Sequence, residues 1–301
     1  MNKQITRLSL VASAVLATAS ASACSVCIAH AIGAGLQAIG AQVLEKNHMI
    51  VGISYESFSK SQDGGTLGTT EKHDQTQMSI DLLKGLNDQV MLRASIPYVY
   101  KRLSATGESP IDTQGLGDIT LGATYQIKPK TNQKVLLGTT LDLKLPTGKN
   151  NLTDINGDRM DEHTQLGTGS TDLSFGLLAT MEGGESNLWF AGLTSRWNGR
   201  NGTGYHYGNT VFYNVGMSHT LSADSSVVLE FNGRMAARDR MEDGTLDGDS
   251  GGHFGYLSVS YRRALGQNTG LIASYQIPVV RQLNGSQTET GLLTIGVFTK
   301  V

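Results

Sequence analysis

Hydrophobic and polar residues alternate along two neighbouring arms of the chain, within residues 115–148. A period of two residues is typical of β-strands, and about ten residues suffice for a tilted strand to cross a bilayer. The first arm places Ile119, Leu121, Ala123, Tyr125 and Ile127 on one face and Asp118, Thr120, Gly122, Thr124 and Gln126 on the other. The second arm opposes Leu137, Thr139, Leu141, Leu143 and Leu145 to Gly138, Thr140, Asp142 and Lys144. Because the second face carries Gly, Thr and charge, the pattern indicates lipid outside and a polar interior.

The same alternation recurs along the chain and predicts about twelve strands. The predicted strands cover residues 48–59, 76–83, 89–101, 118–127, 137–145, 170–181, 187–197, 209–221, 226–238, 253–264, 269–279 and 289–300. Almost no helical periodicity follows residue 43. The predicted fold class is therefore all-β, a transmembrane antiparallel β-barrel of about 12 strands preceded by an N-terminal helical segment.

The connections between these strands alternate in length. Short connections cover residues 85–88, 128–133, 183–186, 222–225 and 266–268, and longer polar ones cover residues 60–75, 102–114, 146–169, 198–208, 239–252 and 280–288. This alternation is typical of short periplasmic turns and longer extracellular loops. It predicts that both ends of the barrel lie on the periplasmic side.

The first 23 residues have the features of a secretory signal peptide. Lys3 and Arg7 precede an apolar run, and small residues at 21–23 provide a cleavage site. The predicted domains are therefore a signal peptide at 1–23, an N-terminal segment at 24–47 and the barrel at 48–301. Lipidation of Cys24 is an alternative, because this cysteine directly follows the cleavage site. The expected location is the outer membrane of a Gram-negative-type envelope.

Composition narrows the class of protein further. The net charge is −2, 37 residues are glycine, 5 are proline, and charged residues make up 17% of the chain. The absence of a basic run in the sequence argues against a nucleic-acid partner. The expected partners are outer-membrane lipid, lipopolysaccharide and a small-molecule substrate, and a periplasmic partner remains open.

The segment before the barrel carries both cysteines. Residues 27–43 have helical spacing and are rich in Ala and Gly, so this part is either a plug folded into the barrel mouth or a loosely held leader. Cys24, Cys27 and His30 are candidates for a disulfide or a metal site. Lipidation of Cys24 also stays open, as does the absence of any specific role for the two cysteines.

Charged residues at inward positions are the candidate lining of the lumen. They are Glu56, Asp81, Arg93, Lys101, Asp118, Asp142, Lys144, Asp172, Arg196, Glu230, Arg234, Arg238 and Arg262. Acids predominate on the first half of the barrel and arginines on the second. Opposed walls of this kind could orient water and small polar solutes. Alternatively, the charges pair with one another across a filled lumen.

Two acidic loops and scattered histidines complete the candidate chemistry. Asp154, Asn156 and Asp158 partly resemble a calcium loop, although a solvated acidic loop is the simpler interpretation, and no other cofactor is expected. The loop at 242–249 has a similar composition. A hydrolase site built from Asp161, His163 and Ser170 is a remote alternative, so the chain is not expected to be an enzyme.

Three sequence blocks resemble a known family. They are GLGDITLGATYQI from Gly115, LDLKLPTGK at Leu141–Lys149 and QLGTGSTDLSFGL at Gln165–Leu177. They resemble an outer-membrane transporter family associated with the meta-cleavage pathway of phenol degradation. The resemblance implies a barrel of about a dozen strands and passage of aromatic or other small hydrophobic compounds.

The function expected from the sequence is a channel for passive uptake of small, hydrophobic or aromatic molecules. An alternative is a filled, non-conducting barrel that acts as a scaffold or sensor for a periplasmic, redox-active partner through the segment with Cys24 and Cys27.

Overall fold

The computed structural model describes residues 40–63, 70–107, 109–127 and 134–301. One antiparallel sheet contains all of its strands, and the sheet closes because β1 pairs with both β2 and β14. The strands are β1 (Met49–Asp63), β2 (Thr70–Asn87), β3 (Val90–Ala105), β4 (Ile111–Leu116), β5 (Thr120–Ile127), β6 (Val135–Lys144), β7 (Asp172–Glu182), β8 (Asn187–Trp197), β9 (Thr210–Ser222), β10 (Ser225–Ala236), β11 (Gly252–Ala264), β12 (Thr269–Leu283), β13 (Gln287–Glu289) and β14 (Leu292–Lys300).

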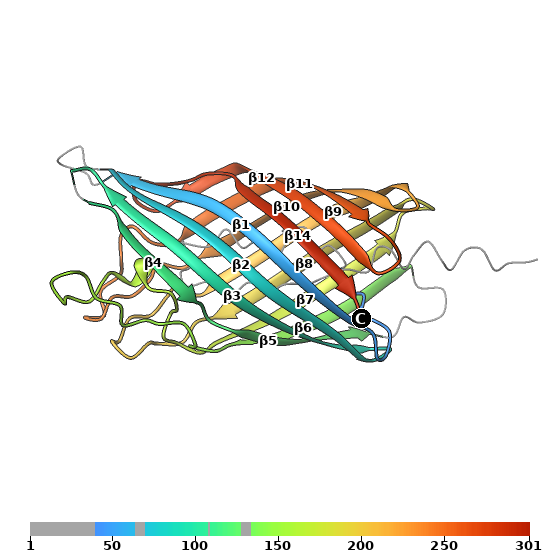
Figure 1. Cartoon of the computed structure of the whole chain (residues 1–301), viewed down its shortest axis with the longest axis horizontal. Coiled ribbons are helices and arrows are strands. Elements are labelled where there is room, and N and C mark those ends of the chain that lie inside the picture. Colours follow the sequence, from blue (N-terminus) through green and yellow to red (C-terminus); the bar gives the residue numbers. More distant parts are fainter. Residues whose placement is uncertain (1–39, 64–69, 108, 128–133) are drawn as a thin grey trace, which may run out of the picture.

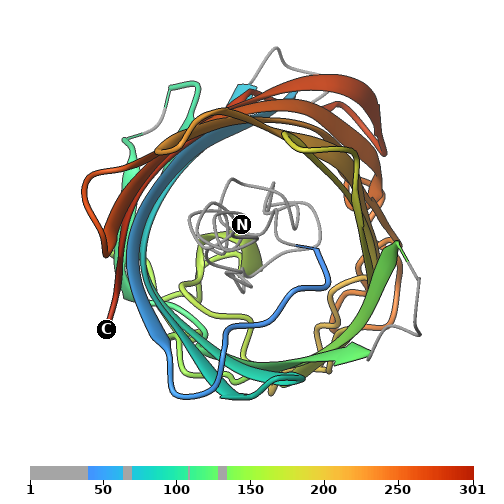
Figure 2. The same cartoon turned by 90° about the vertical axis from the view of Figure 1, so that its right-hand side faces the viewer.

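The sheet forms a tall barrel (Figure 1) with a ring-shaped cross-section (Figure 2). Strands β4 and β13 are short extensions that pair with β3 and β1, and the other twelve form the closed 12-strand barrel. This confirms the all-β class and the strand number. Among the described residues, no helix is both long and apolar enough to span a membrane.

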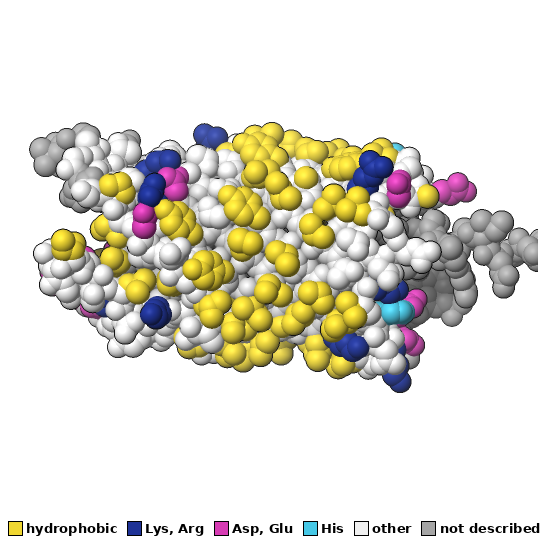
Figure 3. Space-filling model, viewed as in Figure 1, with side chains coloured by type: hydrophobic (Ala, Val, Ile, Leu, Met, Phe, Trp, Pro, Cys, Tyr) yellow, Lys and Arg dark blue, Asp and Glu magenta, His cyan; other side chains and the backbone are white. Residues whose placement is uncertain are grey.

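The two faces of the wall have opposite chemistry. On β1, Ile53 and Tyr55 are exposed whereas Ser54 and Glu56 are buried, as the period of two requires. Figure 3 shows hydrophobic side chains spread over the middle of the barrel, with charged side chains towards its two ends. In lipid, such a wall pairs the backbone N–H and C=O groups of neighbouring strands, and the polar side chains lie inside the barrel.

The connections differ in extent from the prediction on one side of the barrel. Three loops that were expected to start soon after the strands instead begin with further strand, because β1 pairs with β2 as far as Asp63, β3 pairs with β4, and β13 pairs with β1. Hydrophobic residues alternate only within the apolar belt of the barrel, whereas backbone hydrogen bonding between the strands continues beyond this belt. Period-two reasoning therefore underestimates the height of the wall.

The short inner segment before β1 is not helical. Residues 40–47 form turns and coil, and Gly40 and Asn47 adopt the left-handed region with φ values of 61° and 67°. The predicted helix is therefore wrong for this part, since such backbone conformations interrupt a helix. The rest of the predicted signal peptide and helical segment, residues 1–39, lies outside the described residues.

Substituting Leu141 with Arg tests the assignment of the outer face. Leu141 lies exposed on β6, so Leu141→Arg should destabilise the barrel in bilayers by about 2–4 kcal/mol, because arginine would face hydrocarbon. The free energy of unfolding from lipid vesicles measures this change. Ile155→Arg is the matched control, because Ile155 is 98% exposed in a loop and should tolerate the charge. Equal stability of both variants would contradict a lipid-facing β6.

Candidate functional site

The predicted charged positions face the inside of the barrel. Of the thirteen charged candidates, eleven comprise nine buried residues and the half-buried Arg93 and Arg196. The nine are Glu56, Asp81, Asp118, Asp142, Lys144, Asp172, Glu230, Arg234 and Arg262. Lys101 is also buried. Arg238 is a correction: it is exposed and follows the end of β10, because the alternation expected to continue to residue 238 stops at Ala236.

Lys144 joins the three sequence blocks that resemble the transporter family. Its Nζ lies 3.2 Å from Asp118 Oδ2 and 2.5 Å from Asp172 Oδ2, and all three side chains are almost fully buried. Asp118 comes from the first block, Lys144 from the second and Asp172 from the third. These motifs are distant in sequence but build one ion cluster, which we call the Lys144 cluster (Asp118, Lys144, Asp172).

The Lys144 cluster also fixes the long loop between β6 and β7. Asp118 accepts hydrogen bonds from the backbone N–H groups of Gly148 and Thr168, at 2.9 and 2.8 Å. Asp172 accepts one from the N–H of Gly199 at 3.0 Å. Each carboxylate therefore binds both the central ammonium and loop backbone, so both ends of the loop are anchored at the rim.

A second ion pair forms across a glycine of the strand that lies between its two partners. Arg93 of β3 contacts Asp142 of β6 although β5 lies between them, and Gly122 occupies the intervening position on β5. A Cβ at residue 122 would collide with the Asp142 carboxylate. Gly122 thus provides the space in which the two charges meet.

On the opposite wall, buried charged side chains also contact partners. Asn214 donates a hydrogen bond to Glu230 at 2.8 Å, and Arg234 pairs with Glu289. The Tyr256 hydroxyl donates to the second Glu289 oxygen at 3.0 Å. The sequence analysis did not single out Glu289, because the inward parity of the chain changes between β13 and β14.

Two further groups on the inner wall are held by other contacts. Asp81 accepts hydrogen bonds from Ser54 and Ser95 at 3.3 and 2.7 Å. The Arg196 guanidinium lies 4.8 Å from the centre of the Phe212 ring. These interior charges therefore contact partners within the wall, as the pairing alternative considered from the sequence expects.

The loop between β6 and β7 folds towards the barrel axis at one mouth. It contains a short 3₁₀ helix, η3 (Glu162–Thr164). Lys101 Nζ donates to the carbonyl groups of His163 and Gln165 at 2.9 and 2.5 Å. The Tyr207 hydroxyl donates to the Glu162 carbonyl at 3.1 Å. The loop is thereby docked on β3 and on the loop that precedes β9.

An ion pair braces the same loop. Arg159 Nη1 lies 2.6 Å from Glu162 Oε1, and the hydrogen bond to Glu162 raises the pKa of Arg159 above its ordinary value. Beside η3, a pocket is lined by apolar Phe58, Leu103 and Ile111 together with cationic Lys60 and Lys101. This pocket combines a hydrophobic wall with hydrogen-bond donors.

At the other mouth, residues 40–47 run across the inside of the barrel, as the blue segment in Figure 2 shows. The Ala41 N–H donates to Thr180 Oγ1 of β7 at 2.8 Å, and the Val43 N–H donates to Gln126 Oε1 of β5 at 3.1 Å. Asn47 is further bonded to β2, since its N–H donates to the Gly85 carbonyl and its carbonyl accepts from Lys84, both at 3.0 Å. The segment therefore starts at the β7 side and is hydrogen-bonded to three separate parts of the wall.

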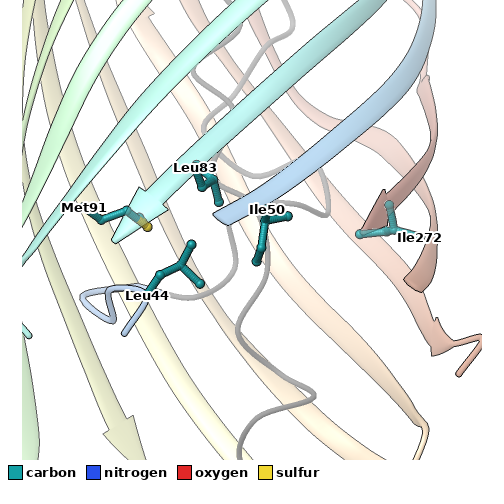
Figure 4. Packing of buried hydrophobic residues seen from close by; sticks show 5 residues of the cluster. All are labelled: Leu44, Ile50, Leu83, Met91 and Ile272. Carbon is teal, nitrogen blue, oxygen red and sulfur yellow. The ribbon is translucent and has the colours of Figure 1, made fainter. Parts of the chain in front are cut away.

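Leu44 anchors the far end of this segment. It packs in a buried cluster with Ile50 of β1, Leu83 of β2, Met91 of β3 and Ile272 of β12 (Figure 4). The sequence analysis did not single out this apolar cluster. Its signal in the sequence is a set of large apolar residues at inward positions close to the short turns.

The remaining candidates are not brought into one site. Cys24, Cys27 and His30 lie outside the described residues. The Asp154 carboxylate accepts hydrogen bonds from the N–H groups of Asn156 and Asp158 and so holds its own turn. The calcium loop stays a prediction. Ser170 donates to Asp172 in the interior network.

A closed antiparallel barrel with an apolar belt outside and paired charges inside defines an outer-membrane β-barrel. The chain belongs to the family described as "Putative MetA-pathway of phenol degradation", whose model matches residues 58–279. This confirms the resemblance seen in the three sequence blocks.

One solved structure shares the fold at low sequence identity, and two others are less similar. The COG4313 outer membrane channel from Pseudomonas putida F1 is 14% identical, with 87% of this chain and 98% of that chain covered and a TM-score of 0.67. The NanC porin is 8% identical, with coverage of 83% and 100% and a TM-score of 0.49. The translocator domain of the autotransporter NalP from Neisseria meningitidis is 12% identical, with coverage of 85% and 89% and a TM-score of 0.48. No curated protein matches the chain.

Substituting Lys144 tests the central role of the Lys144 cluster. Lys144→Met should lower the free energy of unfolding by about 3–5 kcal/mol, because Asp118 and Asp172 would stay buried without their shared cation. Urea unfolding from detergent or vesicles measures this loss. Adding Asp172→Asn should recover part of it by removing one of the two charges. A Lys144→Met variant with unchanged stability would contradict this role.

Proposed function

We propose that the protein is an outer-membrane channel for the passive movement of small molecules, with phenolic and other small aromatic compounds as its substrate class. The observation that carries the channel role is the closed wall with lipid-facing residues outside and polar residues inside. The fold shared with a solved outer-membrane channel supports the same role. The family description, which refers to phenol degradation, supports the substrate class.

The pocket beside η3 has a volume of about 10 Å³, which is room for one water, so a ring enters it only when the surrounding side chains move apart. Phe58, Leu103 and Ile111 then offer apolar contacts to the ring. A binding site with an apolar body and few polar groups is the usual arrangement for small organic ligands. The pocket lies among strands that extend beyond the apolar belt, at the mouth with the long loops.

Residues 40–47 act as the gate at the opposite mouth. The segment is held by the hydrogen bonds of Ala41, Val43 and Asn47 to the wall and by the apolar contacts of Leu44, so it can leave the wall without breaking the barrel. Only contacts of this segment need to be exchanged, whereas opening the wall would break a full ladder. The preceding chain, with Cys24 and Cys27, is attached directly to this gate.

The adjacent residues Leu44 and Glu45 provide a test of this gate. Leu44→Asp should raise single-channel conductance in planar bilayers severalfold, because a carboxylate does not fit the apolar cluster and the segment should leave the mouth. Glu45→Gln is the matched control and should conduct like the unchanged protein, since the Glu45 side chain is 78% exposed. Equal conductance of both variants would show that the segment does not restrict the pore.

Block of the ion current tests the substrate class. Phenol and catechol at millimolar concentration should interrupt the current of the Leu44→Asp channel, whereas glycerol should not, because only the ring can use the apolar contacts of the pocket. Phe58→Ala should weaken the block about tenfold, as expected for loss of one apolar contact surface. Block that is equally strong for glycerol would refute an aromatic substrate class.

A filled barrel acting as a scaffold is the second candidate. The pairing of interior charges and the two inward segments favour it. A properly folded Leu44→Asp variant that remains silent in bilayers would support the scaffold and overturn the channel proposal.

A further inference from the structure

We infer that His163, Asp239 and Asp247 form a binding site for a divalent transition-metal ion at the mouth with the long loops. One candidate ligand atom from each residue lies within 4.8 Å of the others. Two ligands of a zinc ion, each about 2.1 Å from it, are at most about 4.2 Å apart. Side-chain movements of several tenths of an ångström would therefore bring the three donors to ligating distance. We call this group the His163 site.

The backbone brings the two carboxylates of the His163 site together. The Asp247 N–H donates to the Asp239 carbonyl at 3.0 Å, so the two residues face each other in the loop between β10 and β11. Ser250 adds to this link, because its hydroxyl donates to the Asp247 carbonyl and accepts the Asp239 N–H. The spacing of the carboxylates is thus a property of the loop fold rather than of two free side chains.

Asp239 is oriented by further donors. Its two carboxylate oxygens accept hydrogen bonds from the Gly208 N–H at 2.7 Å and from the Tyr205 hydroxyl at 2.9 Å. The Asp239 side chain is fully buried. Outer partners of this kind hold a ligating carboxylate in place and are typical of metal sites.

His163 reaches the site from a different loop. Asp161 accepts the His163 N–H at 2.7 Å and starts η3, and Lys101 holds the His163 carbonyl, so the backbone of this residue is fixed on both sides. Its ring lies edge-on to Tyr205 and Tyr207, with centroids 6.4 Å apart in both cases. These buried rings restrict water around the donors, which favours ion binding over hydration.

The donor set selects the kind of ion. Two carboxylates and one imidazole carry a net charge of −2 when the imidazole is neutral, which balances a divalent cation. An imidazole nitrogen suits zinc and related transition metals, whereas calcium prefers ligands that are all oxygen. Three protein ligands leave further coordination positions for water.

The ion would connect two loops that meet above the barrel. His163 belongs to the loop docked on β3, and the carboxylates belong to the loop before β11. The second loop also joins a small ladder formed by Arg200, His206, Arg240 and Leu246. Metal binding would therefore tie the inward loop to this ladder and stabilise the closed mouth.

Isothermal titration of the intact, detergent-folded protein with zinc chloride tests the site. We expect one zinc ion per chain, and Asp247→Asn and His163→Ala should each weaken binding at least tenfold. Glu242→Gln is the control, because this exposed acid of the same loop is outside the site and its loss removes the same charge. Calcium chloride should bind more weakly than zinc in the unchanged protein.

Two outcomes would overturn the inference. Equal zinc binding by all four proteins would place the ion elsewhere, with Cys24, Cys27 and His30 as the alternative ligands. No zinc binding by the unchanged protein would show that His163 and the two acids only form hydrogen bonds. Trypsin cleavage after Arg240 gives a second readout: zinc should slow it in the unchanged protein and in Glu242→Gln, but not in Asp247→Asn.

Discussion

The hydrogen bonding of the backbone within the bilayer determines the rest of this structure. Lipid offers no partner for N–H and C=O groups, so the sheet must close, and β1 closes it by pairing with both β2 and β14. In the closed barrel, the outer face contacts lipid and the inner face carries polar side chains. Charged groups that enter this interior then need partners, which Lys144, Arg93 and Arg234 provide.

The sites at the two mouths follow from this division. At the mouth with the long loops, the Lys144 cluster anchors the loop ends, and Lys101 draws the middle of the loop inward through carbonyl groups. At the other mouth, Leu44 packs with buried apolar side chains of the wall. The wall therefore holds two inward segments, one by charge and hydrogen bonds and the other by hydrogen bonds together with apolar packing.

The sequence predicts the strands and their two faces better than it predicts the contacts inside the barrel. The alternation of Ile53 and Tyr55 with Glu56 is enough to assign the two faces of β1, because in a membrane barrel alternate residues face lipid and the barrel interior. Glu289 shows the limit, since a change of parity at the rim cannot be read from hydrophobicity. The inward loop was not predictable either, because Lys101 binds backbone carbonyl groups, which every residue has. The partners of Lys144 required the barrel register, which brings three separate motifs to one place.

The most direct measurement is the single-channel conductance of a protein whose inner segment can be locked to the wall. A Cβ at Gly138 would lie 3.1 Å from the Ala41 Cβ, so Ala41→Cys with Gly138→Cys needs a shift of only a few tenths of an ångström to form a disulfide. Replacing Cys24 and Cys27 by serine prevents other pairings. We expect no current from the oxidised protein and recovery on reduction. Equal currents in the two states would contradict passage of small molecules past this segment.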